Sequence, residues 1–225
     1  MVKGEQDYTQ RVLATIRPTG IAGGHLLFHE DFESYGTHYP AAAGTFGITS
    51  TPGEVFEGVG SGKFILAAGG YASTQFTFPM SEAAIVAVEL LFKPEYANLQ
   101  TLLLALDIVD GTYRHRPQAR IYTDQSKVYL QVADDTPAYV TAKSFSSVSI
   151  PALWNMFRFE VDLAAGVYRA IQLSMYRTAL QTQAYQRTSS LAFPYGLLTL
   201  AATNGSWTGG NVFIDDIYVT YEEPS

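Results

Sequence analysis

Apolar and polar side chains alternate along several short segments of this chain, and this alternation restricts the fold more than any other feature. The clearest segment is 155–163, whose odd-numbered and even-numbered positions differ in character: Phe157, Phe159, Val161 and Leu163 against Met156, Arg158, Glu160 and Asp162. Side chains of a β-strand point alternately to its two faces, so this pattern predicts a strand that packs on one side. The other side is expected to meet water or a ligand.

Comparable segments recur along the chain from residue 25 onward. We predict strands at 26–33, 63–67, 72–78, 85–92, 102–108, 119–122, 127–132, 138–142, 155–163, 167–176, 197–201 and 211–221. Turn-forming pairs such as Asp110-Gly111 and Asn204-Gly205 separate most of them. Many short strands divided by tight turns are typical of a β-sandwich or a β-barrel.

Two segments fit more than one secondary structure. Residues 81–91 would suit a capped helix, but the alternation of Val86, Val88 and Leu90 favours a strand. Residues 178–190 are rich in Gln, Ala and Thr and fit either a helix or a long crossing loop.

The composition supports a single all-β domain. Hydrophobic residues make up 47% of the 225 residues and charged residues only 16%, which provides enough apolar surface for one core. The 15 tyrosines and 13 phenylalanines suit pleated surfaces, and the 19 glycines suit tight turns. We therefore predict a two-sheet antiparallel jelly-roll sandwich formed by residues 25–225.

Residues 1–24 differ from the rest of the chain. They are polar, lack sustained alternation and end in a glycine-rich stretch, so we predict an extended N-terminal arm or linker. Charged residues interrupt every apolar stretch in this segment, which argues against a signal peptide. Elsewhere no apolar run approaches the ~18 residues that a membrane helix needs, so we expect a soluble protein.

The balance of ionisable residues and the absence of cysteine exclude several kinds of partner and site. A formal net charge of -7 repels polyphosphate, so nucleic acid and anionic membranes are not expected to bind. Without cysteine, neither disulfide bonds nor thiolate metal sites can form.

Three segments carry a resemblance to a known superfamily. They are residues 29–35 (HEDFESY), 154–163 (WNMFRFEVDL) and 212–219 (VFIDDIYV). Together they resemble the concanavalin A-like lectin and glucanase superfamily, which includes laminin G-like and carbohydrate-binding jelly rolls. The resemblance spans roughly residues 25–221 and implies that the first and last strands lie close together. It bears on the fold more than on the function.

In that superfamily, acidic residues of the first and last strands sometimes hold a structural calcium ion. The matching carboxylates here are Glu30, Asp31, Glu33, Asp215 and Asp216. Calcium prefers several oxygen ligands, so this cluster would suit Ca2+ if the two ends pair. We expect Asp215 to share a face with Phe213, Ile217 and Val219 and therefore to need a partner. The alternative is that Asp215 accepts hydrogen bonds from backbone N–H groups or pairs with an arginine.

The glucanase members carry a Glu-x-Asp-x-x-Glu run on one strand, which places two carboxylates on one face. Here Glu160 and Asp162 supply the first two acidic positions, but Leu163, Ala164 and Ala165 follow them. An ion-paired outer face is the alternative role for both acids. The sequence also lacks the motifs of zinc peptidases, of serine hydrolases and of phosphate-binding loops, so we predict no catalytic residues and no enzyme.

Aromatic residues in loops are the candidates for contact with a sugar, because aromatic rings offer an apolar face. They are Trp207, Tyr35, Tyr39, Tyr71 and Tyr195. Small neighbours make Trp207 the strongest of them, although it would equally well close one end of the core. Trp154 directly precedes the clearest strand and is expected in the core.

One concentrated basic patch occurs in this acidic chain, formed by Arg114, His115, Arg116 and Arg120. It would suit a carboxylate or phosphate on a partner. The alternative is pairing with local acids such as Asp107 and Asp110.

These observations leave three functional hypotheses. The first is a non-catalytic structural or assembly module, such as a phage capsid decoration or tail protein, that binds protein subunits of a larger assembly or a second copy of itself. The second is a lectin-like module that binds a glycan. The third is a glycoside hydrolase of the same superfamily, with Glu160 and Asp162 as its candidate acids.

Overall fold

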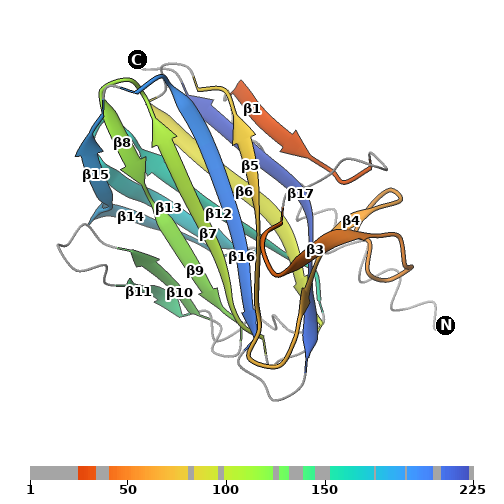
Figure 1. The fold of residues 1–225 in the computed structure, drawn as a ribbon. Coiled ribbons are helices and arrows are strands. Elements are labelled where there is room, and N and C mark those ends of the chain that lie inside the picture. The colour runs from red at the N-terminus through yellow and green to blue at the C-terminus, as the bar shows by residue number, and fades with distance from the viewer. Residues whose placement is uncertain are drawn as a thin grey trace.

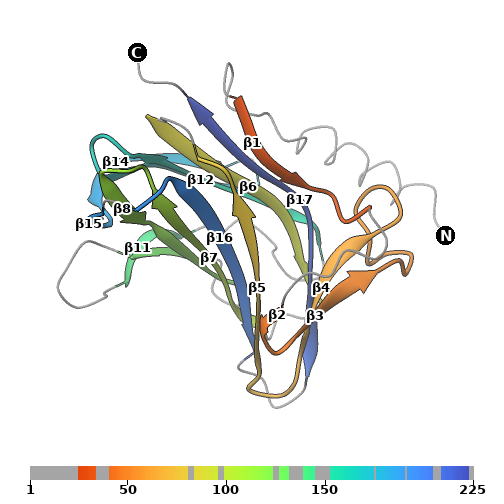
Figure 2. The ribbon, with the colours of Figure 1, turned by 45° about the horizontal axis from the view of Figure 1, so that its top comes forward.

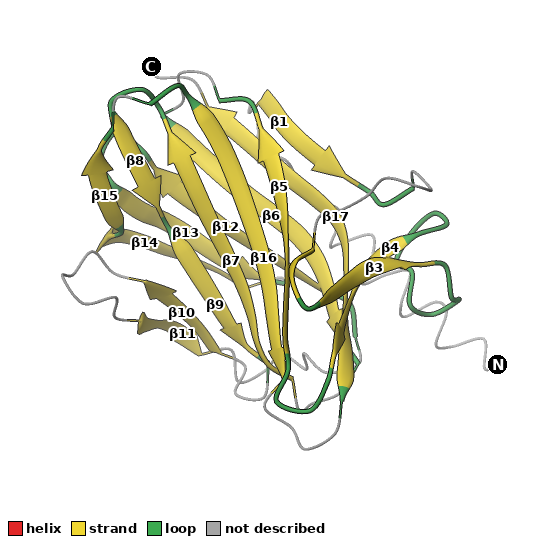
Figure 3. Cartoon of the chain, in the orientation of Figure 1, coloured by secondary structure: helices red, strands yellow, loops and turns green. Residues whose placement is uncertain are grey.

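The computed structural model describes residues 25–33, 41–80, 84–95, 99–123, 127–131, 139–144, 153–174, 176–190, 192–204 and 209–222. All regular structure in these ranges is β-strand (Figure 3). They contain no helix of the length and apolarity needed to cross a membrane. The predicted arm, residues 1–24, lies outside the described residues.

The strands form two antiparallel sheets that lie face to face (Figure 1). The eight-stranded sheet, called sheet A, has the order β14 (Tyr176–Ala184), β13 (Val167–Leu173), β12 (Asn155–Asp162), β6 (Ile85–Pro94), β17 (Gly210–Glu222), β4 (Ser61–Leu66) and β3 (Thr45–Thr49), with β1 (His25–Glu30) also paired to β17. The nine-stranded sheet, called sheet B, has the order β11 (Tyr139–Ser144), β10 (Lys127–Gln131), β9 (Gln118–Tyr122), β7 (Leu99–Val109), β16 (Tyr195–Asn204), β5 (Tyr71–Phe78) and β2 (Ala41–Ala43). Two short strands extend sheet B, because β8 (Tyr113–Arg116) pairs with β7 and β15 (Gln186–Ser189) pairs with β8.

The chain passes repeatedly between the two sheets, as a jelly roll requires. The steps from β4 to β5, from β6 to β7 and from β16 to β17 each change sheets. Figure 2 shows the resulting layers, with β1, β6 and β17 in one and β5, β7 and β16 in the other. The predicted two-sheet antiparallel sandwich is confirmed.

The core lies between the inner faces of the two sheets. Phe157, Phe159 and Val161 of β12 point into it, as the alternation predicts, and Leu102 and Leu104 of β7 meet them from sheet B. Both strands alternate without interruption, so one residue in two reaches the core.

The other face of β12 does not meet water. Met156, Arg158 and Glu160 are only 4%, 7% and 6% exposed. Met156 packs with Leu91, Phe56 and Trp154 in a small separate cluster, so Trp154 lies outside the main core. The prediction of a solvated face was wrong because a second layer of contacts covers this side of sheet A.

A β-bulge in β17 changes which of its residues face the core. Asp215 pairs with Leu91 and Tyr218 with Glu89, so two residues of β17 oppose one residue of β6. Asp216, inside the bulge, has a positive φ of 46°. Val212 and Ile214 point into the core before the bulge, and Ile217 and Val219 do so after it. Asp215 therefore lies on the outer face of sheet A, and the expectation that it shares a face with Ile217 and Val219 was wrong.

Residues 178–190 are neither a helix nor a loop. They belong to β14 of sheet A and β15 of sheet B, and the chain crosses between the sheets at Tyr185. The predicted strand 167–176 is also divided, because Ser174 has a positive φ of 51° and ends β13. Strands β2, β3 and β8 were not predicted.

Candidate functional site

The outer face of sheet B carries the candidate site. Its outward side chains alternate with core residues along each strand, and the strand register aligns them in rows across the sheet. One row contains Lys127, Tyr122, Thr101, Thr203 and Tyr71, from β10, β9, β7, β16 and β5.

The adjacent rows repeat the same distribution of side-chain size. The second row contains Tyr129, Arg120, Leu103, Ala201 and Ser73, and the third contains Gln118, Ala105, Thr199 and Gln75. The central strands β7 and β16 therefore carry mostly small side chains, whereas β9 and β10 on one side carry large polar and aromatic ones. An elongated ligand could lie over the small residues and contact the larger ones.

Four neighbouring positions on β9 and β10 alternate between aromatic and cationic. Arg120 lies directly opposite Tyr129, and Tyr122 lies directly opposite Lys127. The ring centroids of the two tyrosines are 4.8 Å apart with an interplanar angle of 59°. All four side chains are half-buried, so this cluster presents tyrosine rings beside positive charge.

The basic patch predicted from the sequence divides between two faces. Arg114 and Arg116 of β8 lie on the outer face of sheet B, and both reach Asp107 of β7: Nε of Arg114 donates to its Oδ1 at 2.7 Å, and Nε of Arg116 lies 3.9 Å from its Oδ2. Arg120 lies on the same face. His115, by contrast, pairs with Ile108 and is completely buried, so it cannot belong to a partner-binding surface.

Two of the five predicted sugar-contacting aromatics are described. Tyr71, 49% exposed, and Tyr195 both lie on the outer face of sheet B. Tyr71 pairs with Thr203, eight residues beyond Tyr195 along β16, which corresponds to about 27 Å of strand. Tyr35, Tyr39 and Trp207 lie outside the described residues.

Sequence reasoning missed Tyr122, Lys127 and Tyr129. The sequence did contain an indication, because a cation and a tyrosine stand two positions apart on each side of residues 124–126. Residues two apart share a face, and a hairpin between the two segments brings both pairs together.

The carboxylates at the end of β1 and directly after it have backbone partners. Strand β1 does pair with β17, as the resemblance implies. Oε1 of Glu30 accepts a hydrogen bond from the N–H of Phe32 at 2.8 Å, and Oδ1 of Asp31 accepts one from the N–H of Glu33 at 3.1 Å. Glu33 in turn accepts from the N–H groups of Val59 at 2.9 Å and Gly60 at 3.3 Å.

Asp215 is buried on the outer face of sheet A. Its Oδ2 accepts hydrogen bonds from Oγ of Ser61 at 2.6 Å and from the N–H of Phe56 at 3.3 Å. Burial raises the pKa of Asp215 to about 7, although the Ser61 hydrogen bond opposes this change. Asp216 points instead toward His29, with 3.6 Å between Oδ1 and Nε2. Within the described ranges, no group of three or more histidine or acidic side chains is arranged to hold a metal ion.

Glu160 belongs to a chain of buried ion pairs on sheet A. Its Oε1 lies 3.0 Å from Nε of Arg158, and its Oε2 lies 2.9 Å from Nη2 of Arg177. Arg158 also reaches Oε2 of Glu89 at 3.2 Å. Burial raises the pKa of Glu89, outweighing the opposite effect of Arg158. The second predicted acid, Asp162, accepts a hydrogen bond from the N–H of Ala165 at 2.8 Å and so stabilises the turn after β12.

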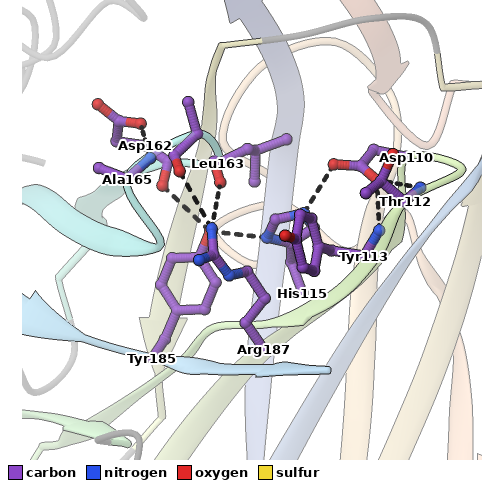
Figure 4. A network of polar contacts seen from close by, with 10 residues as sticks. Asp110, Thr112, Tyr113, His115, Asp162, Leu163, Ala165, Tyr185 and Arg187 are labelled. Carbon is purple, nitrogen blue, oxygen red and sulfur yellow. Dashed lines mark hydrogen bonds and ion pairs between the residues drawn. The ribbon is translucent and has the colours of Figure 1, made fainter. Parts of the chain in front are cut away.

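A separate polar network lies inside the molecule where β8 and β15 meet (Figure 4). Nε2 of His115 is 2.9 Å from Oδ2 of Asp110, and Nδ1 is 3.0 Å from the hydroxyl oxygen of Tyr185. Burial lowers the pKa of His115, although Asp110 acts in the opposite direction. Tyr185 donates to the carbonyl oxygen of Asp162 at 3.1 Å.

A carboxylate, an imidazole and a hydroxyl in series also occur in nucleophilic catalysis. Here His115 is 0% exposed and Tyr185 is 1% exposed, and burial raises the pKa of the Tyr185 hydroxyl above its ordinary value. A buried, more weakly acidic phenol cannot meet a substrate. The network instead joins the two sheets.

Comparison with known proteins identifies structures with a similar fold. No protein-family model matches the sequence, and no curated protein matches it. The structure is similar to a carbohydrate esterase of the Shiga toxin-encoding bacteriophage phi24B, with a TM-score of 0.60 and 16% identity over 89% of this chain and 100% of the other. It is also similar to an endo-β-1,4-glucuronan lyase of the fungus Trichoderma reesei, with a TM-score of 0.57 and 12% identity over 88% and 96% of the two chains.

The fold is a two-sheet jelly roll like that of these two proteins, which is consistent with the resemblance to concanavalin A-like jelly rolls. In this jelly roll the first and last described strands pair in sheet A, and the face with tyrosines and cations lies on sheet B. The TM-scores of 0.60 and 0.57 establish a common fold, whereas the identities of 16% and 12% leave the activity to be argued from the residues themselves.

Proposed function

We propose that the protein is a non-catalytic carbohydrate-binding module whose ligand lies across the outer face of sheet B. The observation that carries the proposal is the cluster of Arg120, Tyr122, Lys127 and Tyr129 beside the small side chains of β7 and β16. Both structural neighbours are named as carbohydrate-active proteins, which supports a carbohydrate as the ligand class.

The chemistry of this face suits a sugar. A pyranose ring has an apolar C–H face that packs on an aromatic ring, and hydroxyl groups at its edge that need hydrogen-bond partners. Tyr122 and Tyr129 supply the rings.

The proposal is tested by affinity electrophoresis of the full chain in gels that contain neutral or acidic polysaccharides, followed by titration calorimetry with those that retard it. We expect Tyr129→Ala and Tyr122→Ala to weaken binding about tenfold, since an aromatic contact contributes ~0.5 to 1.5 kcal/mol beyond its buried area. The matched control is Tyr176→Ala, a tyrosine that is 40% exposed on β14 of sheet A. Absence of binding to every polysaccharide, or equal binding by all three variants, would contradict the proposal.

A structural role in a virus particle is the second candidate. It is favoured by the phage origin of one structural neighbour and by the polar segment 1–24, which would suit an arm that contacts a neighbouring subunit. Light scattering and electron microscopy of the purified protein test this role. A monomer at all concentrations, unchanged by removal of residues 1–24, would argue against it.

A further inference from the structure

We infer that the N-terminal segment, residues 1–24, packs against the outer face of sheet A of its own chain and covers the centre of that face. The segment lies outside the described residues, so the inference is argued from the surface that it would cover. It goes beyond the proposed function, which concerns the outer face of sheet B.

One row of outward side chains crosses four strands of sheet A and is buried along its whole length. Thr220 of β17 pairs with Ala87 of β6, Ala87 with Glu160 of β12, and Glu160 with Ala170 of β13. Their neighbours along each strand point into the core, so these four point outward. They are 8%, 2%, 6% and 2% exposed. The outer face of an antiparallel sheet in a two-layer sandwich ordinarily meets water, so a further layer lies over this row.

The adjacent row is buried as well. Arg158 and Glu89 lie directly opposite each other and are 7% and 4% exposed. A long arginine could lie across the small side chains beside it, but it would then itself be exposed. At the centre of sheet B, the outward residue Ala105 is half-buried instead. The burial on sheet A therefore needs atoms from outside the sheet.

The described parts of the chain do not provide this layer. Every strand in the described ranges belongs to sheet A or to sheet B. Phe56 and Trp154 do fold over sheet A, but they cover Leu91 and Met156. Leu91 lies farther along β6 than Ala87, at a distance of about 13 Å. The cover of the buried row therefore comes from outside the described ranges.

The N-terminal segment enters sheet A at the edge of this row. Leu26 of β1 pairs with Thr220, so the chain before β1 leaves the sheet beside the row (Figure 2). The four strands of the row span ~14 Å, which a segment of this length crosses easily. Residues 81–83 and 223–225 also adjoin this end of the sheet, but they are too short to cross four strands.

The sequence of the segment suits such a cover. Tyr8, Val12 and Ile16 recur at every fourth position and Leu13 adjoins them, so a helix over residues 9–17 would carry one apolar side. A helix of this length is ~14 Å long, which matches the width of the four strands. The two alanines of the row leave a shallow surface on which apolar side chains can pack.

The first experiment places a photo-crosslinking amino acid, p-benzoylphenylalanine, at position 172 of the full chain. Gln172 is half-buried and lies opposite Arg158, at the margin of the buried rows. We expect irradiation to join this position to a peptide from residues 1–24 in a product of monomer mass. The control carries the same amino acid at Gln75, which is exposed on the outer face of sheet B, and should not capture that peptide.

The captured peptide identifies what covers the face. A cross-link to another segment, or no cross-link at position 172, would overturn the inference. Capture of residues 1–24 in a product of dimer mass would also overturn it, because a second copy would then provide the cover, as the assembly role requires.

The second experiment follows cleavage of the full chain by trypsin after Arg11, in the middle of the segment. Ala87→Gln and Ala170→Gln each place a longer polar side chain beneath the cover, so we expect cleavage about tenfold faster than in the unmodified protein, because the segment opens more readily. The matched control is Ala105→Gln on sheet B, which should leave the rate unchanged. Equal rates in all four proteins would overturn the inference. Circular dichroism confirms that each variant is folded, and the cross-linking result does not depend on these substitutions.

Discussion

Nδ1 of His115 lies 3.0 Å from the hydroxyl oxygen of Tyr185, and the two residues come from different parts of the sandwich. His115 belongs to β8 of sheet B, whereas Tyr185 marks the point at which the chain leaves β14 of sheet A for β15 of sheet B. The N–H of Tyr185 donates to the carbonyl oxygen of Gly166 in the β12–β13 turn at 3.2 Å, and Nη1 of Arg187 donates to the carbonyl oxygen of Ala164 in the same turn at 3.0 Å. Polar contacts therefore connect the two sheets at this edge of the sandwich.

We expect Tyr185→Phe to lower the free energy of unfolding by ~1 to 3 kcal/mol, because it leaves the buried Nδ1 of His115 and the carbonyl oxygen of Asp162 without this partner. Urea denaturation measures the change. The control, Tyr176→Phe, removes a hydroxyl from a tyrosine that is 40% exposed and should alter stability by less than ~0.5 kcal/mol. Equal stability of the two variants would show that the network does not hold the sheets together.

The inner faces of the strands could be predicted because their alternation is uninterrupted. Phe157 and Phe159 of β12 are a direct case. The prediction failed in β17, where Asp216 adopts a positive φ and the strand gains one residue against β6. Aspartate tolerates this conformation better than most residues, but the partner strand decides whether a bulge forms. A single sequence does not show which residues of β17 and β6 lie opposite each other.

The candidate site was harder to predict than the fold for a related reason. Tyr71 and Tyr195 were identified as single exposed aromatics, whereas the cluster around Tyr122 and Tyr129 depends on the register between β9 and β10. The buried network was missed because His115 was grouped with its sequence neighbours Arg114 and Arg116. Residues adjacent in a strand point to opposite faces, so that basic patch could not lie on one surface.

Asp215 should make the stability of the protein depend on pH. Its pKa in the folded state is about 7, above the ordinary value of 3.8, so the folded state binds more protons than the unfolded state between these two values. The free energy of unfolding should therefore fall as pH rises from about 4 to about 7. Between pH 5 and pH 7.5 this contribution is on the order of 2 kcal/mol. We expect Asp215→Asn to remove it, which urea denaturation at both pH values would reveal.

The pH dependence of Asp215→Asn must be compared with that of the unmodified protein, because Glu89 and Asp216 also have pKa values raised by burial and titrate in both proteins. Only the difference between the two proteins reports on Asp215. Identical slopes would mean that Asp215 ionises at its ordinary pKa in the folded state.

Arg158 should be far more important for stability than an exposed arginine of the same sheet. Arg158→Ala leaves the buried carboxylates of Glu89 and Glu160 without the cation they share, which we expect to cost ~3 to 5 kcal/mol. Arg169→Ala breaks an exposed pair with Glu222 and should cost less than ~1 kcal/mol. Thermal and urea denaturation compare the two. A similar small loss in both variants would mean that the ion pairs of Arg158 contribute little.

Gly196 of β16 has no side chain and so leaves room for the ring of Phe78 on the paired strand β5. The two residues are directly opposite each other, and a Cβ atom added at position 196 would overlap the Phe78 ring. We expect Gly196→Ala to destabilise the fold by ~1 to 3 kcal/mol, because the ring must leave its place in the core. Gly47→Ala is the control, since nothing lies within 4 Å of a Cβ atom at that position of β3.

A double variant, Gly196→Ala with Phe78→Leu, should recover part of the loss, because the smaller side chain relieves the overlap. Strictly additive losses in this cycle would show that the two positions do not interact, contrary to the register of β5 and β16.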